Sequence, residues 1–133
     1  MARLLRVDAT DTVPIWSQIE LGLRRLVASG GLAAGAPVPS VRDLARELRV
    51  NPATVSKAYQ RLTEGGVLEV RRGDGTYVAE VPPAMGRAER GRALRESALR
   101  YATAAITLGA SRQESLEAVE AAWGEMRGKE EPR

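Results

Sequence analysis

Two helix start signals in close succession constrain the fold of this chain more than any other feature. Residues 38–59 read VPSVRDLARELRVNPATVSKAY. Ser40 followed by Asp43 fits a capping box, which begins a helix, and Asn51 followed by Pro52 fits the cap and first residue of another. Two short helices joined by a turn of about three residues are typical of a helix-turn-helix, whose second helix lies in a DNA major groove.

The second of these helices is expected to have two unlike faces. Residues at helical spacing predict a buried side, made of Val55, Ala58, Tyr59 and Leu62. The opposite side is small, polar or basic, with Ala53, Thr54, Ser56, Lys57 and Gln60. Such a face can approach DNA closely and donate hydrogen bonds to phosphates and base edges. The alternative is an ordinary helical hairpin with a solvated face, and the next segment favours DNA binding.

That next segment predicts a short β-hairpin. Residues 67–71 and 76–79 read as strands, and Arg72-Gly73-Asp74-Gly75 between them is a tight, glycine-bearing turn. Arg71 and Arg72 lie at the base of this turn, within reach of phosphates or a minor groove. A solvent-exposed hairpin with incidental arginines is the alternative, but the preceding helices favour a winged helix-turn-helix.

Apolar periodicity and a proline pair predict the domain organisation. A stripe of apolar residues from Ile15 to Val27 predicts a helix before the motif, and Trp16 beside it is expected to pack in the core, against the hairpin or the linker. Val81-Pro82-Pro83 marks a boundary. We therefore expect a winged helix-turn-helix DNA-binding domain over 1–80 and a helical tail over 81–133. The fold class is mostly α with a small β-hairpin.

Two helices, at about 84–108 and 112–127, are expected in the tail, the second begun by the capping box Ser111 to Glu114. Two helices alone cannot bury their own apolar seam. A second copy of the chain can complete the burial, whereas the alternative is a hairpin folded back on its own winged helix. We expect a homodimer, which predicts a two-fold operator. The expected interface residues are Leu94, Tyr101, Ala105, Leu116, Val119, Trp123 and Met126.

Composition agrees with a duplex-binding protein and excludes several other classes. The net charge is +3, and residues 42–72, with seven Arg and Lys against four Asp and Glu, account for the whole excess. The chain has no Cys and no His, which excludes disulfides, the usual zinc sites and histidine general bases. We expect no enzyme, no cofactor and no metal. No apolar run approaches a membrane span, and no signal-peptide core is seen, so we expect a cytoplasmic protein without a membrane partner.

Over roughly residues 8–80 the chain resembles the GntR family of bacterial transcriptional regulators. The matching segments are Pro14-Ile15-Trp16-Ser17-Gln18-Ile19, Pro39-Ser40-Val41-Arg42-Asp43-Leu44-Ala45, Val50-Asn51-Pro52-Ala53-Thr54-Val55-Ser56-Lys57-Ala58-Tyr59 and Gly73-Asp74-Gly75-Thr76-Tyr77-Val78. The short remainder resembles the YtrA-like subgroup, whose tail is a pair of helices. This resemblance implies a dimeric repressor of an operator on double-stranded DNA, often of a transporter operon. It identifies no small-molecule effector.

The resemblance also implies which residues contact DNA. Some relatives carry arginine in the turn where this chain has Pro52 and Ala53, so Arg42 becomes the better candidate for reading guanine, and Arg49 is assigned to a phosphate. The expected DNA-binding residues are Ser40, Arg42, Arg49, Asn51, Pro52, Ala53, Thr54, Ser56, Lys57, Arg71, Arg72 and Gly73. The alternative function is a winged-helix module for protein or RNA contacts, which would call for an apolar recognition face.

Overall fold

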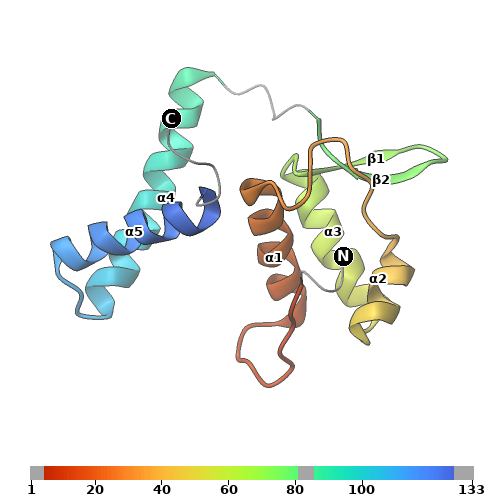
Figure 1. Ribbon diagram of the computed structural model, residues 1–133, viewed down its shortest axis with the longest axis horizontal. Coiled ribbons are helices and arrows are strands. Elements are labelled where there is room, and N and C mark those ends of the chain that lie inside the picture. Colours follow the sequence, from red (N-terminus) through yellow and green to blue (C-terminus); the bar gives the residue numbers. More distant parts are fainter. Residues whose placement is uncertain (1–4, 81–85, 128–133) are drawn as a thin grey trace. The chain divides into compact units, whose positions relative to one another are not determined.

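The computed structural model describes residues 5–80 and 86–127 of the chain. It divides into an N-terminal unit, Met1–Pro83, and a C-terminal unit, Ala84–Arg133 (Figure 1). The expected boundary at Val81-Pro82-Pro83 lies outside the described residues. Within the described ranges, no helix has both the length and the apolar character needed to cross a bilayer. The fold class is as predicted, mostly α with one small β-hairpin.

The N-terminal unit contains three helices followed by the hairpin. Both predicted helix starts of the motif are present: the Ser40 hydroxyl accepts from the Asp43 N–H at 3.1 Å, and the Asn51 side chain accepts from the Ala53 N–H at 2.8 Å. Each bond satisfies an N–H that has no partner inside its helix. The elements are α1 (Ile15–Ser29), α2 (Val41–Leu48), α3 (Pro52–Glu64), β1 (Leu68–Arg71) and β2 (Gly75–Val78).

The turn between α2 and α3 is held in a left-handed conformation by Arg49. This residue has φ 57°, the only positive φ of a described non-glycine residue. Its N–H donates to the carbonyls of Ala45 and Arg46 and so ends α2. The Val50 N–H also donates to Ala45 at 3.0 Å. Such local bonding fixes the angle at which α3 leaves α2.

The core of the N-terminal unit lies where α1 and α2 pack against α3 (Figure 1). The predicted inner face of α3 is buried, and Tyr59 donates its hydroxyl to the Pro39 carbonyl at 2.7 Å. Burial raises the pKa of the Tyr59 phenol far above its ordinary value, so the group stays a neutral donor. Buried core residues include Ile19, Leu23, Leu44, Ala45, Val55, Ala58, Leu62, Leu68 and Val78.

The hairpin is antiparallel, with Leu68 opposite Val78 and Arg71 opposite Gly75. β1 begins one residue later than the sequence predicts, and β2 keeps its predicted length but begins and ends one residue earlier. Val38 donates to the Thr76 carbonyl at 3.0 Å, so the segment before α2 lies along the second edge of β2. This pairing joins the hairpin to the helix-turn-helix.

The C-terminal unit is a hairpin of α4 (Arg87–Thr107) and α5 (Arg112–Arg127). The capping box of α5 is complete: the Glu114 N–H donates to the Ser111 hydroxyl at 3.1 Å, and the Ser111 N–H donates to Glu114 at 2.9 Å. Tyr101 donates its hydroxyl to the Ser115 carbonyl at 2.7 Å and links the two helices. Of the described residues in this unit, Ala105 alone is buried.

Candidate nucleic-acid interface

The outward face of α3 has the character that the sequence predicts. Its first turn presents exposed side chains, and Thr54 is half-buried. The exposed residues are Asn51, Pro52, Ala53, Ser56, Lys57 and Gln60. This face is supported by the core packing beneath it, so a rigid, polar surface of small side chains faces away from the core of the unit.

Residues of α2 extend this surface. Arg42 is exposed in the first turn of α2 and forms no ion pair with any described residue, whereas Arg46 pairs with Asp43 at 3.6 Å. Arg49 is exposed and also sets the turn through its backbone. The Ser40 oxygen is used in capping α2. Arg42 is therefore the cation of α2 whose guanidinium is available to a base edge or a phosphate.

The two arginines of the hairpin differ in their surroundings. Arg71 contacts Glu69 at 3.0 Å and Glu80 at 3.6 Å, and its guanidinium lies 4.0 Å from the Tyr77 ring centroid. The hydrogen bond to Glu69 raises the pKa of Arg71. Arg72 is exposed and unpaired among the described residues. Arg71 thus contributes to hairpin structure, whereas the charge of Arg72, in the turn of the hairpin, is not compensated by a described carboxylate.

Gly73, the residue after Arg72, has φ 77°, a left-handed conformation that favours glycine and closes the hairpin turn.

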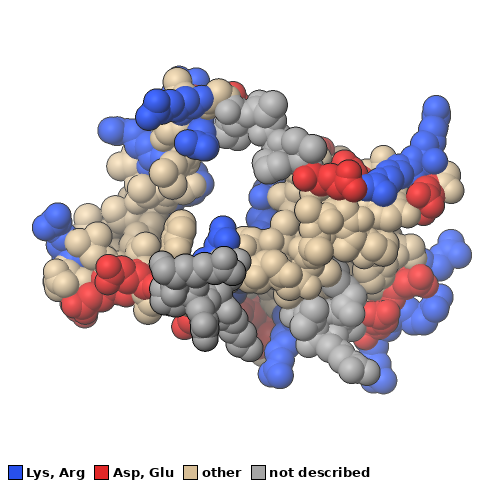
Figure 2. Space-filling view, turned by 45° about the horizontal axis from the view of Figure 1, so that its top comes forward, with Lys and Arg blue, Asp and Glu red and all other residues tan. Residues whose placement is uncertain are grey.

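In Figure 2 basic side chains project from the outer edge of the N-terminal unit, with acidic side chains between them. The positive charge of this unit is therefore not a uniform patch. It is carried by particular arginines and by Lys57, which form no ion pair with any described residue.

The Trp16 ring contacts α3, a partner that the sequence did not indicate: the Lys57 ammonium lies 4.2 Å and the Arg61 guanidinium 5.1 Å from its centroid. The physical reason is the packing of α1 on α3, which brings the first turn of α1 beside two cations spaced one helical turn apart. The linker on which Trp16 was expected to pack lies outside the described residues.

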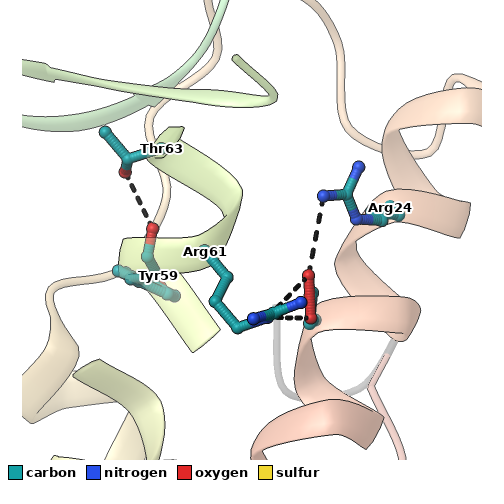
Figure 3. Close-up of polar contacts among 5 residues, drawn as sticks. Arg24, Tyr59, Arg61 and Thr63 are labelled. Carbon is teal, nitrogen blue, oxygen red and sulfur yellow. Dashed lines mark hydrogen bonds and ion pairs between the residues drawn. The ribbon is translucent and has the colours of Figure 1, made fainter. Parts of the chain in front are cut away.

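An ion cluster that sequence reasoning missed joins α1 to α3 (Figure 3). The Glu20 side chain, 12% exposed, accepts from the Arg61 Nε at 2.9 and 3.2 Å, and Arg24 approaches it at 3.5 Å. Glu20 and Arg24 are four residues apart on one face of α1, and this spacing alone could have predicted their ion pair. The partnership with Arg61 depends on tertiary packing, which the sequence did not specify.

The C-terminal hairpin leaves apolar side chains in solvent. Trp123 is 68% and Leu94 is 70% exposed, and Leu116, Val119 and Tyr101 are also exposed. Met126 is half-buried. Ala105 is 7% exposed and is already covered within the hairpin, so it offers little surface to a second copy. A groove of about 440 Å³ runs between α4 and α5, lined by Tyr101, Ala102, Ile106, Leu116 and Val119 among others.

Comparisons with known proteins agree with this geometry. Residues 16–78 match the gntR family of bacterial regulatory proteins. The HTH-type transcriptional repressor YtrA of Bacillus subtilis is 40% identical over 77 residues, which are 58% of this chain and 59% of that protein. The HTH-type transcriptional regulator Rv1152 of Mycobacterium tuberculosis is 30% identical over 112 residues, 84% of this chain and 88% of that protein.

A solved structure shows similarity over most of the chain. The protein described as a transcriptional antiterminator from Listeria monocytogenes EGD-e superposes with a TM-score of 0.79 at 25% identity, covering 92% of this chain and 91% of that one. The similarity therefore includes both the winged helix and the helical tail.

Proposed function

This chain belongs to the gntR family of bacterial regulatory proteins, and we propose that it is a homodimeric repressor of a two-fold-symmetric operator. Its relatives are transcriptional regulators, and the chain is a regulator with a DNA-binding fold, not an enzyme. The proposal assigns DNA binding to residues 1–80 and dimerisation to residues 81–133. The observation that carries it is the exposed polar face of α3, flanked by unpaired arginines.

In the proposed complex, α3 enters the major groove with its first turns against the bases. Ala53 allows close approach, and Thr54 and Ser56 supply hydroxyls. Arg42 is the proposed reader of guanine, because its guanidinium is unpaired and can donate two parallel hydrogen bonds to O6 and N7. Lys57, Arg49 and Arg72 are proposed to contact phosphates, which position the protein without reading sequence. Arg71 is left out of this set because Glu69 and Glu80 already neutralise it.

The proposed dimer is formed by the C-terminal hairpin. Its two helices expose an apolar face that extends the groove along α5, and exposed apolar patches of this kind are typical of association surfaces. A second copy has the complementary face by symmetry. Two α3 helices related by a two-fold axis would then read half-sites about one helical turn apart. The core of this interface is proposed to be Leu116, Val119 and Trp123.

Binding of such a dimer over a promoter would exclude polymerase, which is how a repressor acts. The YtrA relative is itself a transcriptional repressor, and this supports the proposal. The resemblance to that subgroup suggests a transporter operon as the target. A regulator of this kind works beside the chromosome in the cytoplasm. The alternative of a protein-binding or RNA-binding module is less well supported, because the exposed face of α3 is polar rather than apolar.

Selection of genomic fragments bound by the full-length protein tests this function. We expect a small set of enriched sites with an inverted repeat. Arg42→Ala should weaken binding to such a site by about 1–3 kcal/mol and relax preference at one position in each half-site. Arg25→Ala, which removes an exposed arginine on α1, is the matched control and should leave the base preference unchanged. Enrichment no better than that of random fragments would overturn the proposal.

A further inference from the structure

Lys57 is held in an unusual way for a cation on a proposed DNA-binding face. It forms no ion pair with any described residue, and its ammonium lies 4.2 Å from the centroid of the Trp16 ring. Lys57 belongs to α3, whereas Trp16 belongs to the first turn of α1. The two side chains therefore meet only because the helices pack together.

We infer that Trp16 is a positioning residue, which holds the Lys57 ammonium in place for a DNA phosphate. This inference rests on the proposed function, and it adds a residue outside the helix-turn-helix to the DNA-binding machinery. It assigns Trp16 no contact of its own with DNA.

The chemistry of the contact supports this role. The negative face of an aromatic ring attracts a cation but carries no net charge, so Lys57 stays fully positive. A carboxylate in the same place would neutralise the charge that a phosphate needs. An ammonium has three N–H donors, and the ring face occupies one side of the group, which leaves donors for a phosphate oxygen. Trp16 thus orders a flexible side chain without using its charge, which lowers the entropy cost of binding.

The neighbouring cation shows a separation of roles. Arg61, one turn further along α3, lies 5.1 Å from the same ring, but its Nε donates to both oxygens of Glu20 at 2.9 and 3.2 Å. Its charge is therefore already compensated by Glu20, and this ion pair fixes α3 to α1. Of the two cations that lie over the ring, Lys57 is the one that is not paired with a carboxylate.

A double-mutant cycle tests the inference with the full-length protein and a labelled duplex of mixed sequence. Lys57→Met should lower the magnitude of the salt slope by about one per subunit contact. Trp16→Leu should weaken binding about two- to tenfold, because the flexible Lys57 side chain would then have to be ordered on binding. In the Lys57→Met background the same Trp16→Leu change should have no effect. Trp16→Phe keeps a ring face and should restore most of the affinity.

Arg72 provides the matched control, because it is an unpaired cation on a different element. Trp16→Leu and Arg72→Met should add independently, whereas Trp16→Leu and Lys57→Met should not. Thermal unfolding establishes that each variant is folded, and Trp16→Met replaces the leucine variant if that one unfolds. The inference is overturned if the losses from Trp16 and Lys57 simply add, or if removing the ring increases affinity.

An NMR measurement on the unaltered protein tests the same point. Ring currents of Trp16 should shift the Lys57 side-chain protons upfield, and the shift should persist when the duplex is bound. Loss of that shift on binding would mean that Lys57 leaves the ring to reach DNA, which contradicts a positioning role. If the unaltered protein binds no duplex at all, the proposed function fails. If it binds but the two residues are uncoupled, the positioning role alone fails.

Discussion

Trp123→Ala is expected to dissociate the proposed dimer. The side chain is 68% exposed in the single chain. A tryptophan presents up to about 250 Å² to solvent, so a second copy can bury roughly 170 Å² of Trp123. At about 25 cal/mol per Å², this burial is worth about 4 kcal/mol for each copy. Even if the second copy covers only half of this area, the symmetric pair loses about 4 kcal/mol, which is about a thousandfold in the dissociation constant.

Sedimentation at micromolar concentration measures this change directly. The unaltered chain should sediment as a dimer and Trp123→Ala as a monomer. Leu99→Ala is the matched control, because Leu99 is also exposed but lies two residues before Tyr101 and hence on another side of α4. An unchanged sedimentation coefficient for Trp123→Ala would refute the tail interface, as would a monomeric unaltered protein.

Three further predictions concern individual charges. Arg72→Met should lower the magnitude of the salt slope of duplex binding by about one per subunit. Arg71→Met should leave the slope close to the unaltered value, because Glu69 and Glu80 already neutralise Arg71. Equal effects of the two variants would contradict the assignment of the phosphate contact to Arg72. Glu20→Gln should lower the free energy of unfolding of the N-terminal unit by about 1–2 kcal/mol, since both arginine partners are about half exposed and regain water. Thermal unfolding checks this against Arg46→Gln, whose exposed pair with Asp43 should be worth under about 0.5 kcal/mol. The backbone N–H of Ser111 lowers the pKa of Glu114 in the folded tail. The stabilising contribution of this carboxylate is therefore present at neutral pH, and it is lost as the pH falls from the ordinary range of a glutamate through the lower folded pKa. Circular dichroism should show this acid loss of helix to be smaller in Glu114→Gln, and an identical pH profile would count against it.

Local signals in the sequence predicted the helix-turn-helix well. Ser40 and Asn51 cap their helices as expected, because a cap depends on hydrogen bonds within three residues. The Ser111 capping box is reciprocal for the same reason. Periodicity identified the buried face of α3 correctly, since that face is set by the geometry of a single helix.

Contacts between elements could not be predicted in the same way. The partner of Trp16 depends on how α1 packs on α3, and periodicity does not specify this packing. Arg71 and Arg72 are adjacent in sequence, yet their surroundings differ. Glu69 lies on the same face of β1 as Arg71, whereas only the strand register, which pairs Tyr77 with Glu69, brings the Tyr77 ring to Arg71. The cluster of Glu20 with Arg61 likewise joins residues on two helices. Which charges remain available to DNA is therefore a property of the tertiary structure.

The central claim is that the outward face of α3 enters the major groove. Titration of the isotopically labelled full-length protein with a selected operator, followed by amide chemical shifts, tests it most directly. The largest amide shift changes should cluster at the starts of α2 and α3 and at the hairpin tip. The residues concerned are Arg42, Asn51, the residues from Ala53 to Lys57, and Arg72. Saturating binding that leaves Asn51 to Lys57 unperturbed would contradict it.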